Sequence, residues 1–112
     1  MRPLLALAAL NGLLAVAIGA FGAHGIADPQ AKAWIATGAQ YGLGHAAAAL
    51  AVAGRSRPAA WAMTLGALIF GGALYGLGLS GPRLLGAVAP IGGSLMILGW
   101  ALLLWNVLRR GR

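Results

Sequence analysis

The polar side chains that could do chemistry gather in one stretch of an otherwise apolar chain. Thr37, Tyr41 and His45 recur every four residues, so a helix would carry all three on one face, with Gln40 beside that face. An imidazole titrates near neutral pH, which suits a proton relay. These residues, together with Asn11 from the first apolar run, form a predicted polar seam. Inside a membrane such a seam could line a path for protons, ions or small solutes.

The polar seam also has a structural interpretation, which we favour. At a rise of about 1.5 Å per residue, Asn11 and His45 both lie roughly 12 Å from the same membrane surface. They are therefore expected to meet across two neighbouring helices. A hydrogen bond in which Asn11 holds His45 neutral would set the register of those helices. No carboxylate lies within an apolar run to act as a counter-ion, which weakens any proton-coupled scheme.

Composition leaves little room for other chemistry. Asp28 is the only acidic residue and cysteine is absent, so the chain offers neither a carboxylate pair nor a thiol nucleophile. His24 lies near Asp28, but two ligands are too few for a zinc site. We therefore predict no catalytic residue, no metal site and no cofactor, and we do not expect an enzyme.

The elements that carry these residues are membrane helices. Of 112 residues, 61% are apolar and 8% are charged, whereas a soluble domain carries roughly a quarter charged residues. Only helices or closed barrels cross a bilayer, and the apolar runs are too long for barrel strands and do not alternate. The sequence predicts an all-α membrane protein, a single antiparallel four-helix transmembrane bundle over residues 1–112. Its helices are expected at about 3–23, 29–53, 59–79 and 84–108.

Local signals refine these helices. Asp28 followed by Pro29 is typical of a helix start, with the aspartate as N-cap. Pro90 lies inside the last run, where it predicts a kink or a local unwinding. A secretory signal peptide is the alternative interpretation of the first run. The length of that run and the three apolar runs after it favour a membrane helix.

The basic residues predict the orientation. With four crossings, one side of the membrane holds six of them and the other side holds Lys32 and Arg83. The positive-inside rule then places both termini in the cytoplasm. The same charges suit anionic phospholipid headgroups, and no aromatic-rich basic face indicates nucleic acid. The six residues are Arg2, Arg55, Arg57, Arg109, Arg110 and Arg112.

Two pairs of glycines indicate close helix packing. Gly38 and Gly42, and likewise Gly72 and Gly76, are four residues apart, which places a small surface on one face of each helix. We expect these faces to pack inside the bundle, and a dimer face is the alternative. The partners considered are therefore the lipid bilayer and a second copy in a homo-oligomer.

Several motifs together resemble a known family, the YgdD-like small inner-membrane proteins, also called domain of unknown function 423. The resemblance covers nearly the whole chain and implies a four-helix inner-membrane protein, without implying an activity. In the third helix the family often has Gly-Ser-Leu-Tyr, where this chain has Ala73 in place of the serine. The motifs are Gly19-Ala20-Phe21-Gly22-Ala23-His24-Gly25, Tyr41 with His45-Ala46, Leu74-Tyr75, Pro90-Ile91-Gly92-Gly93 and Gly99-Trp100.

These observations predict a multi-pass protein of the cell (inner) membrane, of unknown biochemical function. The favoured hypothesis is a non-enzymatic protein that acts through packing or as an accessory subunit. The alternative is a minimal oligomeric channel or transporter that uses the polar seam around His45. Four short helices cannot easily enclose a path alone, so that alternative requires an oligomer.

Overall fold

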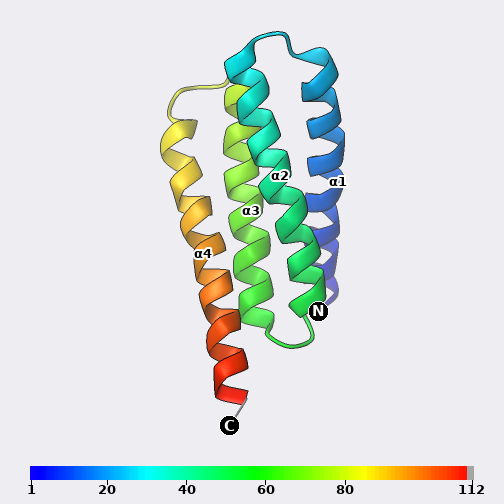
Figure 1. The fold of residues 1–112 in the computed structure, drawn as a ribbon, viewed down its shortest axis with the longest axis vertical. Helices are drawn as coiled ribbons and strands as arrows, with labels where there is room; N and C mark the ends of the chain where they lie inside the picture. Colours follow the sequence, from blue (N-terminus) through cyan, green and yellow to red (C-terminus); the bar gives the residue numbers. More distant parts are fainter. Residues whose placement is uncertain (111–112) are drawn as a thin grey trace.

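The computed structural model describes residues 1–110, which form four helices and no strand. The prediction of an all-helical fold is confirmed over this range. Figure 1 shows the helices side by side, with the α1–α2 and α3–α4 connections at one end. The N-terminus, the α2–α3 connection and the end of α4 lie at the other. Arg112 is outside the described residues. The helices are α1 (Arg2–Gly25), α2 (Pro29–Val52), α3 (Arg57–Gly78) and α4 (Leu85–Arg110).

Side-chain caps begin α2 and α3. The Asp28 carboxylate accepts a hydrogen bond from the Ala31 N–H at 2.8 Å, and Pro29 follows it, so the predicted helix start is confirmed. The Ser56 hydroxyl accepts from the Ala59 N–H at 3.3 Å in the same way. Because each cap satisfies a backbone donor locally, the two connections can stay short.

Three of the four helices are long and apolar enough to cross a membrane: α1, α3 and α4. Buried residues make up 56% of the apolar stretch of α3, against 22% in α1 and in α4. The third helix is therefore the centre of the molecule, and α1 and α4 turn most of their surface outward. α2 is less apolar because alanine, glycine and polar residues fill it.

Glycines let α4 approach α3 backbone to backbone. A Cβ added at Gly66 would lie 2.7 Å from the Met96 nitrogen, and one at Gly92 would meet the backbone of Phe70. A Cβ at Gly99 would lie 3.1 Å from the Ala59 oxygen. Larger residues at these positions would force the helices apart, so the crossing depends on small ones.

The two glycine pairs predicted from spacing have different outcomes. Gly38 and Gly42 pack inside the chain, since an added Cβ would lie 2.9 Å and 3.3 Å, respectively, from the ring and hydroxyl of Tyr75. Gly72, in contrast, is exposed and has no atom within 4 Å of an added Cβ. The prediction that Gly72 and Gly76 share a packing face is therefore wrong, because only Gly76 meets a neighbour, the Leu85 side chain.

The fourth helix runs unbroken through Pro90. The predicted local unwinding is therefore wrong. The Ser94 hydroxyl donates to the Pro90 carbonyl at 2.8 Å, one turn back along the same helix. Since Pro90 lies in the second turn, the hydrogen bond that its ring removes is close to the helix start, where the disturbance is small.

Candidate functional site

A groove between α2 and α4 is the candidate site. Both helices pack closely on α3 and have little direct contact with each other, so α3 forms the floor of the groove. Its volume is about 440 Å³, within the usual range of ligand sites of roughly 300–1,000 Å³. It is lined by Thr37, Tyr41 and His45 from α2, Phe70 from α3, and Gly93, Met96, Ile97 and Trp100 from α4.

His45 and Trp100 join the two walls of this groove. The indole Nε1–H of Trp100 donates to Nε2 of His45 at 3.0 Å. On the other side of the ring, Nδ1 of His45 lies 2.8 Å from the Tyr41 carbonyl oxygen. A ring that accepts at Nε2 and donates from Nδ1 is a neutral imidazole, so the two partners assign its tautomer. Both nitrogens of His45 are thus engaged within the chain.

Aromatic rings fill the remaining space beside His45. The ring of Tyr41 lies 6.2 Å from His45, nearly parallel to it, and 5.3 Å from Phe70 in an edge-to-face arrangement. Tyr41 is 46% exposed. Thr37 is also exposed and lines the groove one turn away. The structure therefore brings together three members of the predicted polar seam: Thr37, Tyr41 and His45.

Asn11 is not part of this groove. Its side chain is 2% exposed, and its Nδ2 donates to the Gly42 carbonyl oxygen at 3.0 Å. The predicted hydrogen bond between Asn11 and His45 is therefore wrong. Asn11 does tie α1 to α2, but it meets the face of α2 that carries Gly42. His45 lies three residues further on, about 300° around the helix, and turns toward α4.

Gln40 also lies apart from the groove. It is exposed on the outward surface of α2 and does not line the cavity. Gln40 and Gly44 are four residues apart and therefore lie on the same side of α2. Both are exposed, and no atom lies within 4 Å of a Cβ added at Gly44, so no other helix covers this side. The predicted polar seam is thus split over three surfaces of α2, which face α1, α4 and the outside.

Within α3, two buried polar groups have no hydrogen-bond partner among residues 1–110. These are the Thr64 and Tyr75 hydroxyls, both on α3. The Tyr75 hydroxyl lies against Gly42, close to the Asn11 side chain. Both groups lie in the packed interior and neither lines the groove.

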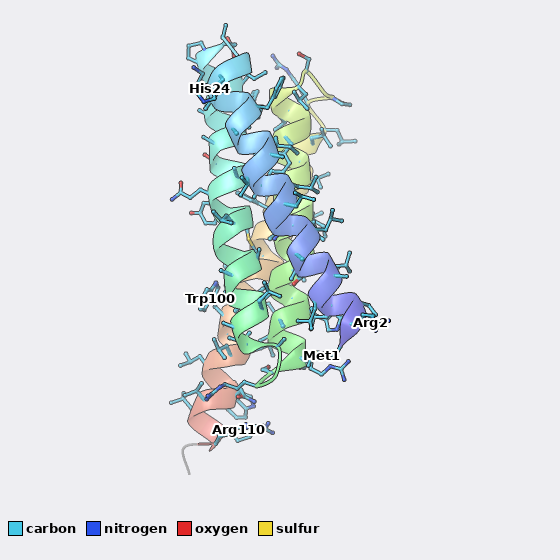
Figure 2. The ribbon with its side chains drawn as sticks, turned by 90° about the vertical axis from the view of Figure 1, so that its right-hand side faces the viewer. Met1, Arg2, His24, Trp100 and Arg110 are labelled. Atoms are coloured by element: carbon cyan, nitrogen blue, oxygen red, sulfur yellow. The ribbon has the colours of Figure 1, made fainter. Side chains whose placement is uncertain are left out.

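Sequence reasoning missed Trp100 as the partner of His45, because helical periodicity groups residues along one helix and does not identify partners on another helix. A usable signal existed. Counting residues from the ends of the helices gives Trp100 a depth close to that of His45, and a buried indole N–H usually finds an acceptor. In Figure 2, Trp100 lies nearer the end with Met1 and Arg110 than the end with His24.

The groove offers few groups for catalysis. Across residues 1–110, no three His, Cys, Asp or Glu side chains come together as metal ligands would. The groove contains one imidazole, one phenol and one threonine hydroxyl among apolar side chains. Such an arrangement can hold helices in register and accept an apolar group from the bilayer.

Comparison with known proteins places these features in a family. The family described as "Protein of unknown function (DUF423)" matches residues 18–93. The UPF0382 inner membrane protein YgdD of Escherichia coli strain K12 is 39% identical, over 99% of this chain and 93% of the relative. YwdK of Bacillus subtilis, a UPF0382 membrane protein, is 38% identical over 92% of this chain and 94% of the relative. A UPF0382 membrane protein of Schizosaccharomyces pombe is 40% identical over 87% of this chain and 94% of the relative.

No solved structure matches the chain. The relatives carry membrane names and no stated activity, in agreement with a chain that has three apolar helices able to span a membrane. The predicted location in the cell (inner) membrane agrees with the names of the Escherichia coli relatives. The chain belongs to the DUF423 family and is a multi-pass membrane protein of unknown biochemical function.

Proposed function

We propose that this protein is a non-enzymatic packing protein of the membrane that assembles with a second copy through the outward face of α2. In this proposal all four helices cross the bilayer, neighbours run antiparallel, and both termini lie in the cytoplasm. The observation that carries the proposal is the small and polar character of that outward face.

The distribution of charge supports the topology. Arg2, the two arginines flanking Ser56, and Arg109 with Arg110 lie at one end of the molecule, whereas Lys32 and Arg83 lie at or near the connections of the other end (Figure 1). The basic end would face the cytoplasm. Leu4 and Ala8 of α1 are fully buried against the rest of the chain, which supports α1 as a retained helix rather than a cleaved signal peptide.

The outward surfaces of the helices differ. The exposed residues of α1 and α4 include large apolar side chains such as Leu13, Ile97 and Leu104, which suit lipid. The outward face of α2 instead carries mainly small residues and one amide, bordered by exposed Leu43 and Leu50. α2 is also the one helix among the four that is not apolar enough to be a candidate span. The residues of this α2 face are Ala33, Gln40, Gly44, Ala47 and Ala51.

Gln40 has the strongest need for a partner. It lies roughly 18 Å along the helix from Val52, near the middle of a hydrocarbon layer of about 30 Å. Lipid offers an amide no hydrogen bonds, so an exposed glutamine at this depth is costly. A second copy related by a two-fold axis would present its own Gln40 amide, and the small residues around it allow close approach.

Cysteine crosslinking tests the proposal directly, because the natural chain contains no cysteine. Gly44→Cys and Gly72→Cys both introduce a thiol where no atom lies within 4 Å of an added Cβ, on α2 and α3 respectively. In native membranes, oxidation should link two chains through Gly44→Cys and leave Gly72→Cys monomeric. Adding Gln40→Leu should weaken the link at Gly44→Cys.

Either of two results would end the proposal: equal crosslinking at both positions, or monomers only at Gly44→Cys with no other adduct. A crosslink from Gly44→Cys to a different membrane protein would contradict assembly with a second copy and would favour an accessory-subunit form instead. Identifying the adduct by mass distinguishes that form from the homo-oligomer.

A transport role for the groove is the second candidate. It is favoured by the cavity of about 440 Å³ that Thr37, Tyr41 and His45 line. It is weakened because both nitrogens of His45 already have partners in the chain. Flux of protons or small ions into proteoliposomes, compared with His45→Ala and Tyr41→Phe, decides the question. Flux equal to that of empty vesicles would rule it out.

A further inference from the structure

A second pocket lies at the end of the molecule where α4 finishes. Its volume is about 430 Å³, and it lies between the α2–α3 connection and the last turns of α4. Figure 2 shows Arg110 at this end, beyond Met1. The lining residues that matter here are Arg55, Arg57, Trp105, Asn106, Arg109 and Arg110.

The four arginines of this pocket have no acidic side chain to pair with. Asp28 is the only acidic residue of the chain, and it lies in the α1–α2 connection at the opposite end (Figure 1). Four guanidinium groups around one small pocket repel each other, and an anion between them would relieve that repulsion. Guanidinium groups bind phosphate oxygens through paired N–H donors. The start of α3 at Arg57 adds the partial positive charge of a helix N-terminus.

Asn106 supplies an independent indication of a ligand. It is 8% exposed, it lines this pocket, and its Oδ1 is buried without a hydrogen-bond partner among residues 1–110. A buried amide oxygen without a partner is costly. Because Oδ1 is an acceptor, the ionised oxygens of a phosphodiester cannot satisfy it. The missing group must carry a hydrogen, as a hydroxyl does.

The surroundings of the pocket match the headgroup zone of a membrane. Trp105 lines it and is 64% exposed, as expected of a tryptophan at a membrane interface. Leu102 lines its inner side, and exposed Leu98 lies one turn further toward the hydrophobic middle of α4. A phosphate held by the arginines would therefore leave acyl chains free to run along α4.

We infer that this pocket binds an anionic phospholipid whose headgroup carries a free hydroxyl, with phosphatidylglycerol as the simplest example. The arginines bind the phosphodiester, and Asn106 Oδ1 accepts from the headgroup hydroxyl. Trp105 and Leu102 contact the first part of the acyl chains. This site does not depend on the α2 face that the proposed dimer uses.

Native mass spectrometry of the purified full-length chain tests the site. The protein is titrated with phosphatidylglycerol, phosphatidylmethanol or phosphatidylcholine, and the fraction that retains lipid is measured. The unmodified chain should retain phosphatidylglycerol best and phosphatidylcholine least. Asn106→Leu should lower retention of phosphatidylglycerol about fivefold, the equivalent of one neutral hydrogen bond. It should barely change retention of phosphatidylmethanol, an anionic phosphodiester whose headgroup has no hydroxyl.

Charge variants give the matched comparison. Arg57→Gln with Arg109→Gln removes two cations from the pocket and should lower retention of both anionic lipids by about tenfold or more. Arg2→Gln with Arg83→Gln removes the same charge outside the pocket and should change retention little. Helical content and elution volume identify variants that fold. Since Arg57 and Arg109 are exposed, their double variant keeps the test decisive even where Asn106→Leu does not fold.

Four results would overturn the inference. One is equal retention of phosphatidylglycerol and phosphatidylcholine by the unmodified chain. Another is an equal loss in the pocket and control double variants, which would mean that only net charge matters. The third is displacement of phosphatidylglycerol by soluble glycerol 3-phosphate in excess, since the pocket would then take a soluble phosphate ester. The fourth is unchanged phosphatidylglycerol retention in a folded Asn106→Leu variant, which would remove the hydroxyl contact and with it the preference for a headgroup that carries a hydroxyl.

Discussion

The His45–Trp100 groove and the arginine pocket both use α4 as a wall, yet they treat their polar groups differently. In the groove, each nitrogen of His45 has a partner inside the chain. In the pocket, the buried Oδ1 of Asn106 has none within residues 1–110, and four arginines lie around it. A polar group in a membrane protein that is satisfied internally sets how helices pack, whereas an unsatisfied one on a residue that lines a pocket indicates a partner from outside.

The variant expected to have the largest effect breaks the contact on which both regions depend. In Gly92→Leu the new side chain would enter the backbone of Phe70 and Gly66 on α3, so α4 would be pushed away. Overpacking of this kind should lower the free energy of unfolding by about 1–3 kcal/mol or more. Unfolding in a denaturing detergent, followed by far-UV circular dichroism, should show the loss.

Gly72→Leu is the control for this substitution, because it adds the same side chain where an added Cβ meets no atom within 4 Å. It should unfold like the unmodified chain. Equal stability of Gly92→Leu and Gly72→Leu would mean that the α3–α4 crossing is looser than the structure indicates, and neither region would then be well defined.

The next effect in size concerns the groove. His45→Leu and Trp100→Phe each remove the hydrogen bond between α2 and α4. Each should lower the free energy of unfolding by roughly 0.6 kcal/mol, the measured average for interhelical bonds in a membrane protein, and by no more than about 1.7 kcal/mol, the measured maximum. In the double variant the losses should be less than additive, because both changes remove the same bond. His24→Leu, at the exposed end of α1, is the matched control. Fully additive losses would count against a direct bond.

The smallest effect has the opposite sign and concerns the pocket. With no added phospholipid, Asn106→Leu should leave the free energy of unfolding unchanged or raise it by up to about 1 kcal/mol, since it removes a buried oxygen that has no partner. Asn11→Leu is the comparison, because its amide does have a partner, the Gly42 carbonyl, and its loss should destabilise the chain. If the two substitutions destabilise equally, the distinction between satisfied and unsatisfied groups fails.

Much of the fold was predictable from local signals. The first and last residues of the four helices lie within two residues of those expected from apolar runs, turn residues and prolines. Asp28 before Pro29 predicted its cap correctly, because a cap involves atoms only three residues apart. Pro90 shows the limit of such reasoning, since its effect depends on how close it lies to the start of α4.

The candidate sites were predicted only in part. Periodicity correctly grouped Thr37, Tyr41 and His45, because spacing along one helix is a local property. Depth counting proposed Asn11 as the partner of His45, but depth leaves the rotation of each helix open. Asn106 was not considered at all, although the arginines around it were recognised as an orientation signal.

The sequence by itself determined that this chain forms helices in a membrane, since so few charged residues cannot cover its surface in water. It also determined the residues that share a face on each helix. Only the tertiary structure decided which faces meet: Asn11 with Gly42, His45 with Trp100, and the α2–α3 connection with the end of α4. The reason is that helix rotation and partner choice depend on close packing between distant residues, which helical periodicity leaves undetermined.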